Sequence, residues 1–206
     1  MHNPYPHLEL TIDGKLKVDK PIPGRFLLKN GNASKELDPN KFISLGKLLP
    51  ILRNSPSHER ATALRYIQSV LQDDELVNAV FLSKLKLDLT INDGEGNCGV
   101  SLDIIQAIKE MQNNGHQVWT YAPEKAISAG AYIWMEGDHL YTTDDADLLW
   151  HTGHPNDLPI MMAFFDKAQE PLRRAFLNAI AKNDKACHEI TTKGRVLVRA
   201  GLAKFM

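Results

Sequence analysis

The stretch KLDLTINDGEGNCGVSLDIIQAIKEMQNNGHQVWTYA, residues 86–122, decides the fold. Its first residues, KLDLTIND, alternate apolar and polar side chains, which predicts a β-strand. A glycine-rich turn follows, and residues 101–115 have the apolar spacing of an amphipathic helix that ends at Asn-Asn-Gly. QVWTYA is predicted to be the next strand. A strand, a helix and a strand in this order predict a βαβ unit with parallel strands.

The same alternation continues down the chain. Residues 128–137 are predicted to form a helix after the turn at residues 123–127. Residues 139–143 are predicted to form a short strand, and the segment DADLLWH ends at His151. The sequence therefore predicts an α/β fold with a mostly parallel sheet.

The flanking regions carry weaker patterns. Two alternating runs around Asp13-Gly14 predict a β-hairpin, and the polar residues 30–40 predict a loop. Pro50 is expected to kink or end a helix that begins near Phe42, and Ser55-Pro56 to start the next one. Residues 159–184 form a long helical region with a break predicted at Pro171.

Composition excludes several classes of protein. The 206 residues suit one α/β domain, and a hydrophobic share of 43% is enough for a core. The formal net charge is −1 without a basic stripe, which argues against nucleic acid as a partner. Two cysteines make no disulfide framework. We see no signal peptide and no apolar run that would span a membrane, so we expect a cytoplasmic protein.

Three candidate catalytic features follow predicted strands: the glycine turn at residues 94–96, Ser128 and His151. Sites in parallel α/β sheets form at the carboxyl ends of the strands, where these features would meet. A serine hydroxyl needs a base to become a nucleophile, and histidine titrates near neutral pH. Backbone N–H groups at a glycine turn and a helix N-terminus can stabilise an oxyanion. The pattern is compatible with a serine hydrolase.

Three short motifs sharpen this hypothesis. Residues 91–96 read Ile-Asn-Asp-Gly-Glu-Gly, residues 124–131 read Glu-Lys-Ala-Ile-Ser-Ala-Gly-Ala, and residues 149–151 read Leu-Trp-His. In order and spacing they resemble the motifs Ile-Asn-Ser-Pro-Gly-Gly, Gly-Gln-Ala-Ala-Ser-Met-Gly-Ala and Met-Ile-His of the Clp protease proteolytic subunit, a family of the Clp/crotonase superfamily. The resemblance implies that family's fold of repeated ββα units, with a mostly parallel sheet and a protruding helical region.

The resemblance also implies roles for individual residues. Ser128 would be the nucleophile, His151 the general base, and the N–H groups of Gly96 and Ala129 the oxyanion hole. Val198-Arg199-Ala200-Gly201-Leu202 resembles the family's Val-x-x-Gly-Leu segment. Counting back from it places the third member of the triad at Asp184, with Asp166 and Glu189 as rivals. The family's chemistry needs no metal and no cofactor.

The same resemblance implies partners and a division of the chain. The substrate would be a peptide or unfolded protein, and the chain would form a homo-oligomer through the helical region at residues 159–181. An ATPase unfoldase is a candidate partner. Residues 86–206 would be the catalytic core of a single domain, with a divergent region at residues 1–85 packed on it.

Departures from the family leave other interpretations open. Gly94 and Glu95 stand where the family has proline and glycine, so a catalytically inactive structural subunit is one alternative. A crotonase-type acyl-CoA enzyme, which shares the fold, is another. Ser128 and His151 could be packing residues, and Cys98 a second nucleophile. Lys125, three residues before Ser128, resembles the lysine of serine–lysine dyads, although we interpret it as a solvated charge.

Overall fold

The computed structural model describes residues 6–153, 156–182 and 188–206. Within these ranges it has ten strands and eight helices. The strands are β1 (His7–Leu16), β2 (Gly24–Asn30), β3 (Ala33–Leu37), β4 (Lys86–Gly96), β5 (Gln117–Ala122), β6 (Lys125–Ile127), β7 (His139–Thr142), β8 (Asp147–His151), β9 (Glu189–Lys193) and β10 (Lys204–Phe205). The helices are α1 (Asn40–Asn54), α2 (Arg60–Leu71), α3 (Asp74–Leu82), α4 (Cys98–Asn113), α5 (Ala129–Trp134), α6 (Asp157–Phe165), α7 (Leu172–Ala181) and α8 (Gly194–Arg199).

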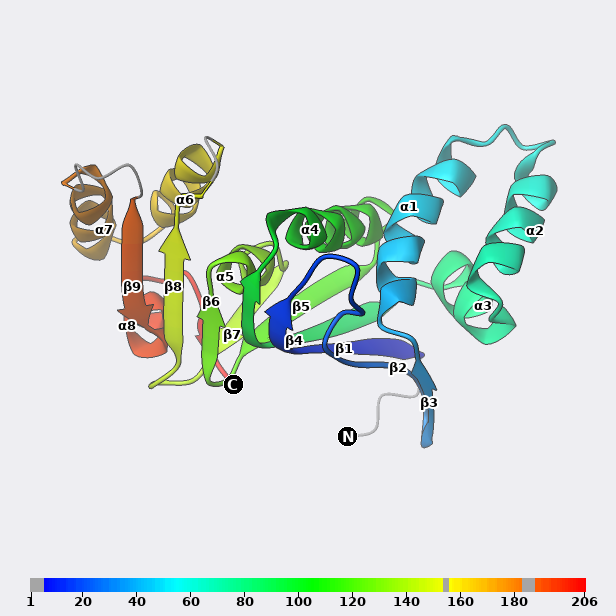
Figure 1. Ribbon diagram of the computed structural model, residues 1–206, viewed down its shortest axis with the longest axis horizontal. Helices are drawn as coiled ribbons and strands as arrows, with labels where there is room; N and C mark the ends of the chain where they lie inside the picture. Colours follow the sequence, from blue (N-terminus) through cyan, green and yellow to red (C-terminus); the bar gives the residue numbers. More distant parts are fainter. Residues whose placement is uncertain (1–5, 154–155, 183–187) are drawn as a thin grey trace.

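The strands form one mixed sheet that branches at β4. The main path runs β10-β7-β5-β4-β1-β2-β3, and β6, β8 and β9 leave it from the end of β4. This branch runs crosswise to the main path in Figure 1. The pairings of β1, β4, β5, β6, β7, β8 and β10 with one another are parallel, whereas β1–β2, β2–β3 and β8–β9 are antiparallel. The prediction of a mostly parallel α/β sheet is confirmed.

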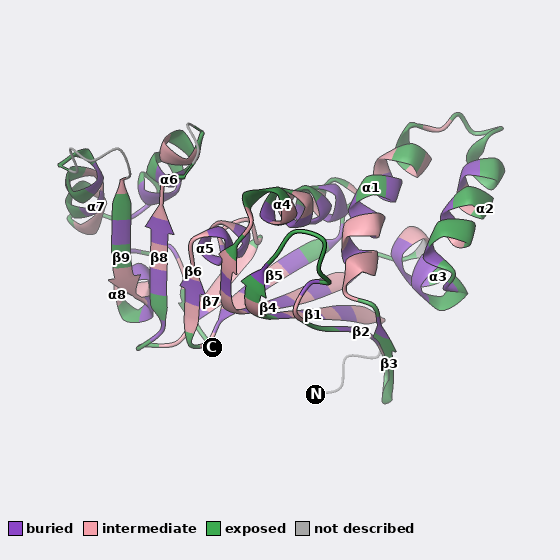
Figure 2. Ribbon diagram, in the orientation of Figure 1, coloured by how far each residue is buried: buried purple, intermediate pink, exposed green. Residues whose placement is uncertain are grey.

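The core lies between the sheet and the helices α1, α4 and α5. Leu87, Leu89 and Ile91 of β4 are fully buried, as their alternation predicted. Ile104 and Ile108 of α4 are buried too. Figure 1 shows α4 and α5 lying along one side of the strands, and Figure 2 shows that both helices contain buried segments. This packing fixes the start of each helix relative to the end of the strand that precedes it.

The N-terminal residues contribute β1, β2 and β3, which form one end of the main sheet path beside β4. β1 pairs in parallel with β4 along its length. α1 packs on α4, where a Cβ at Gly46 would lie 2.4 Å from the Cα of Ala107. The Nζ atom of Lys35 on β3 lies 2.9 Å from the buried carboxylate of Asp73, the N-cap of α3.

No described helix has the length and apolar character needed to cross a membrane.

The predicted hairpin turn at Asp13-Gly14 is wrong. Both residues lie within β1, because the strand continues in pairing with β4 and an irregularity follows Gly14. Gly14 has a φ of +114°, a conformation that favours glycine. The reversal occurs at residues 17–23, after which β2 pairs antiparallel with β1. The Asp-Gly pair therefore marks a bulge and not a turn.

The structure also differs from the sequence prediction at three other places. Part of the predicted loop at residues 30–40 is β3, which pairs with β2. α1 continues past Pro50 to Asn54, because Leu49 and Leu52 on either side of the proline pack on the same core. α2 begins at Arg60 with Glu59 at its N-cap, not at Ser55-Pro56. The helical region after residue 157 divides into α6 and α7, and the break lies before Leu172, as Pro171 predicted.

Candidate functional site

Ser128 occupies the junction between a strand and a helix. β6 ends at Ile127 and α5 begins at Ala129, so the serine is the single residue between them. Its N–H donates to the carbonyl of Leu149 at 2.8 Å. Its own carbonyl accepts from the N–H groups of Ala131 and Tyr132 in the first turn of α5. The main chain of Ser128 is therefore held from both sides.

The backbone of Ser128 is strained. Its φ and ψ are 54° and −118°, a region that residues with a Cβ seldom adopt. Such a conformation costs about 1–3 kcal/mol and persists only where the surrounding structure enforces it. A sharp, strained turn from strand to helix is the way α/β-hydrolases expose a nucleophilic serine.

His151 stands on the neighbouring strand. β8 runs parallel to β6, with Ile127 opposite Leu149, and His151 is the last residue of β8. Because both strands end at the same edge of the sheet, Ser128 and His151 line one cavity of about 210 Å³. Within the described ranges, no hydrogen bond joins the Ser128 hydroxyl to the His151 ring. Such contacts are often longer in the free enzyme and shorten when a substrate binds.

The cavity is lined by residues from α4, α5, β8, the loop after β8 and α6. From α4 and α5 it is lined by Cys98, Ser101, Leu102, Ile105, Lys109, Ser128, Ala129, Tyr132 and Glu136. His151, Gly153, Asn156, Asp157 and Ile160 line it from β8, the following loop and α6. The wall is mainly apolar. Tyr132 supports the loop as well, because its hydroxyl donates to the His151 carbonyl at 3.3 Å.

Glycines allow α5 to approach the end of β4. A Cβ on Gly130 would lie 2.2 Å from the carbonyl oxygen of Asp93, and one on Gly94 would lie 2.5 Å from the Cα of Gly130. Gly94 has a φ of +70° and Asp93 a φ of 96°. This backbone contact fixes the position of α5, and hence of Ser128, relative to the last residues of β4.

The two predicted oxyanion donors differ in their surroundings. Ala129 lines the cavity and begins α5, so its N–H belongs to the first turn, which has no intrahelical acceptor. Gly96 ends β4 beside Leu16 of β1 and is not one of the described residues that line the cavity. Its φ is +140°, and a Cβ there would lie 2.1 Å from the Leu16 carbonyl oxygen. Ala129 is thus better placed than Gly96 to donate to a group bound beside Ser128.

The three candidates for the third acid differ in their surroundings. Asp184 lies outside the described residues. Asp166 is bound to Arg173, whose Nε donates to its carboxylate at 2.9 Å. Glu189 lies directly opposite His151 in the antiparallel pair β8–β9. Cross-strand partners project from the same face of a sheet, so the side chains of Glu189 and His151 are neighbours.

Lys125 and Cys98 also have defined places. The Nζ atom of Lys125 lies 3.1 Å from Oδ2 of Asp93, so its charge is paired and not simply solvated. Lys125 is not among the described residues that line the cavity. Cys98 is a free, exposed cysteine on the cavity wall, whereas the second cysteine, Cys187, lies outside the described residues.

Several lining residues escaped the sequence analysis. Leu102, Ile105 and Lys109 lie on one face of α4, at spacings of three and four residues. Their periodicity predicts a helix face but not what the face lines. Glu136 lies in the turn after α5, and the isolated sequence gave no sign that it points into a cavity. The role of the α4 residues and of Glu136 in lining the cavity follows only from the way α4 and α5 pack side by side.

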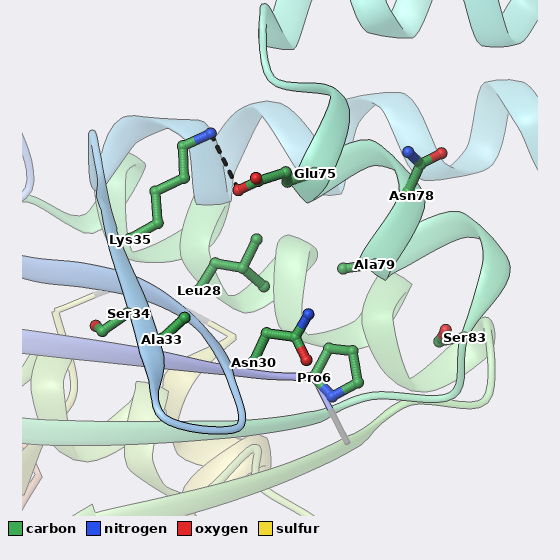
Figure 3. A pocket seen from close by; sticks show the side chains of 10 residues that line it. All are labelled: Pro6, Leu28, Asn30, Ala33, Ser34, Lys35, Glu75, Asn78, Ala79 and Ser83. Carbon is green, nitrogen blue, oxygen red and sulfur yellow. Dashed lines mark ion pairs between the residues drawn. The ribbon is translucent and has the colours of Figure 1, made fainter. Parts of the chain in front are cut away.

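A larger cavity of about 500 Å³ lies at the other end of the sheet, between the β2–β3 hairpin and α3 (Figure 3). Lys35 and Glu75 face each other across it, with 3.4 Å between Nζ and Oε2. Its described lining consists of Pro6, Leu28, Asn30, Ala33, Ser34, Lys35, Glu75, Asn78, Ala79 and Ser83. No histidine is among its described lining residues, whereas the Ser128 cavity is lined by both a serine and a histidine.

Comparisons with known proteins give distant similarities in structure alone. No protein family and no curated protein matches the sequence. A solved structure described as an enzyme is 14% identical and aligns with a TM-score of 0.45 over 72% of this chain and 88% of its own. A peptidase from Plasmodium falciparum is 13% identical and aligns with a TM-score of 0.44 over 72% of this chain and 86% of its own. These similarities are too remote to assign a function.

Proposed function

We propose that this protein is a serine peptidase of the Clp type, with Ser128 as nucleophile and His151 as general base. The strained turn that presents Ser128 into a cavity shared with His151 carries the proposal. The order of elements is consistent with it, since β5-β6-α5 and β7-β8-α6 are successive strand–strand–helix units. Such units are what the resemblance to the Clp/crotonase superfamily predicts.

The chemistry follows from the positions of these groups. The Ser128 Oγ attacks the peptide carbonyl while His151 takes its proton, and the carbonyl oxygen becomes an oxyanion. The N–H of Ala129 donates to that oxyanion. His151 then protonates the leaving amine as the C–N bond breaks, which leaves an acyl group on Ser128. Water activated by His151 cleaves this ester and restores the serine.

Glu189 is our choice for the group that orients His151. It lies directly opposite His151 in the register of β8 and β9. An acid in this role holds the imidazole in one tautomer and stabilises its protonated form. The formation of a homo-oligomer, and the delivery of unfolded protein by an ATPase, remain predictions.

The inactive-subunit alternative also has specific support. Gly96 pairs with β1 and is not among the described residues that line the cavity, which argues against it as an oxyanion donor. Removal of one such donor typically lowers the rate by about a hundredfold to a thousandfold. Whether Ser128 is an activated nucleophile therefore separates the two functions.

A fluorophosphonate distinguishes them, because it reacts only with an activated serine. We expect one covalent adduct in the intact mass of the wild-type protein and none in Ser128→Ala, and we expect His151→Ala to slow labelling by about a hundredfold or more. Ser101→Ala is the matched control, since Ser101 lines the same cavity and should leave the adduct unchanged. A folded wild-type protein that forms no adduct would support the inactive subunit.

A further inference from the structure

The Ser128 cavity is a groove with different chemistry at its two ends. α4 and α5 begin near the adjacent ends of β4 and β6, where Asp93 is opposite Ala126. At the far end, the Nζ atom of Lys109 lies 3.6 Å from Oε2 of Glu136. Because these two residues meet, the helices run from the Ser128 end toward the same ion pair.

The groove between these ends suits the stem of a long side chain. Leu102 and Ile105 of α4 and Ile160 of α6 form its walls, and Leu102 is 63% exposed. From Ala129 to Trp134 the rise of α5 is about 7.5 Å, and Glu136 lies two residues beyond its end. A short aliphatic side chain would not fill this length. The end of the groove at Lys109 and Glu136 is therefore reached only by the tip of a long side chain.

Glu136 has an unmet capacity to accept hydrogen bonds. Its side chain is 20% exposed, and among the described residues its carboxylate accepts no hydrogen bond. The Lys109 ammonium approaches it only at 3.6 Å, and that side chain is half exposed. The main chain of Glu136 is held by Gln112, whose Nε2 donates to the Glu136 carbonyl at 2.8 Å. The carboxylate is therefore positioned on the groove wall while its acceptor sites stay available.

We infer that Glu136 is a specificity determinant that selects a lysine or arginine beside the scissile bond. The inference rests on the proposed peptidase function. Lysine and arginine lay their aliphatic stems on apolar surface while their charge seeks a polar partner. The stem would lie on Leu102, Ile105 and Ile160, and the cation would bind Glu136 in place of Lys109. Hydrogen bonds between charged groups of this kind are among the stronger ones in proteins.

The test compares two fluorogenic peptide substrates that differ only at the residue contributing the attacked carbonyl: lysine or norleucine, its uncharged analogue. We expect the wild-type protein to cleave the lysine substrate with the higher kcat/KM. Glu136→Gln should lower kcat/KM for lysine about tenfold or more and leave norleucine nearly unchanged. Lys109→Met, which removes the competing cation, should raise kcat/KM for lysine.

Each other outcome has a definite meaning. A preference for norleucine that Glu136→Gln leaves unaltered, with cleavage dependent on Ser128, overturns this inference and keeps the peptidase. If neither substrate is cleaved and fluorophosphonate forms no adduct, the proposed function fails and the inference with it. An adduct without cleavage of either substrate contradicts the inference alone. A thermal unfolding midpoint of Glu136→Gln equal to that of the wild type would show that the variant keeps its fold.

Discussion

At the scale of single residues, the backbone around Ser128 depends on the absence of a Cβ at Gly130. The carbonyl of Asp93 occupies the space that this Cβ would need, 2.2 Å away. A methyl group there must push α5 away from the end of β4. The position of the serine on its turn is thus set by a neighbour that contributes no side chain.

Gly130→Ala is therefore expected to destabilise the protein by about 1–3 kcal/mol, the usual cost of overpacking, and to slow fluorophosphonate labelling of Ser128. Urea unfolding gives the free energy, and intact mass against time gives the labelling rate. Gly153→Ala is the control for stability, since its Cβ would meet nothing closer than 3.9 Å. Equal stability of both variants with the wild type would show that α5 is not held by this contact.

His116 is a second residue whose role the structure defines. Its side chain is buried, and its Nδ1 accepts from the N–H of Leu85 at 3.0 Å. Protonation would turn this nitrogen into a donor and break the bond. Burial lowers the pKa of His116 below its ordinary value of 6.5. The contact joins the segment before β4 to the segment before β5.

The direction of its pH dependence follows. Below about pH 6.5 the unfolded chain binds a proton at this position while the folded chain does not, so stability falls as the pH falls. We expect the free energy of unfolding of the wild type to fall by up to about 1.4 kcal/mol per pH unit below pH 6.5 because of this histidine. His116→Asn should lack this part of the decrease. Urea unfolding at pH 7.5 and 5.5 measures both proteins. His58→Asn, at an exposed position, should behave like the wild type. A pH dependence unaltered in His116→Asn would refute this assignment.

At the scale of secondary structure, the sequence was most informative where a strand is buried on one face and a helix follows. The alternation of Leu87, Leu89 and Ile91 predicted the strand over residues 86–93, and all three side chains are buried. β4 nevertheless continues through the predicted glycine turn and ends at Gly96. Short strands with little burial have too few apolar positions for an alternating pattern to predict them. β9 buries only Ile190 among its five residues, and β6 has three residues in all. Their pairing with β8 depends on contacts distant in sequence.

The candidate site shows the same division. Ser128 and His151 could be predicted to meet because each follows a parallel strand, and such strands end at one edge. Gly96, Glu189 and Glu136 could not be placed in this way. Gly96 is held by the extension of β1, and Glu189 faces His151 through the register of β8 and β9. The position of Glu136 depends on how α4 and α5 pack.

At the scale of the whole molecule, the question is whether residues 1–85 and 86–206 fold as one unit. β1 pairs with β4 through most of the length of both strands. α1 lies on α4 so closely that a Cβ at Gly46 would stand 2.4 Å from the Cα and 2.5 Å from the Cβ of Ala107. Hydrophobic residues from both regions belong to a single buried cluster. Contacts of this extent couple the stability of the two regions.

Gly46→Val tests this coupling, because the three tryptophans, Trp119, Trp134 and Trp150, all lie in the second region. We expect the variant to lose about 2–3 kcal/mol. The urea transition seen by tryptophan fluorescence and the one seen by far-UV circular dichroism should move together. Ile51→Val, on the exposed side of α1, should leave both transitions in place. If Gly46→Val instead gave an early transition in circular dichroism while the fluorescence transition stayed unchanged, the first 85 residues would unfold separately. The Ser128 site, whose elements all follow residue 86, would then be independent of them.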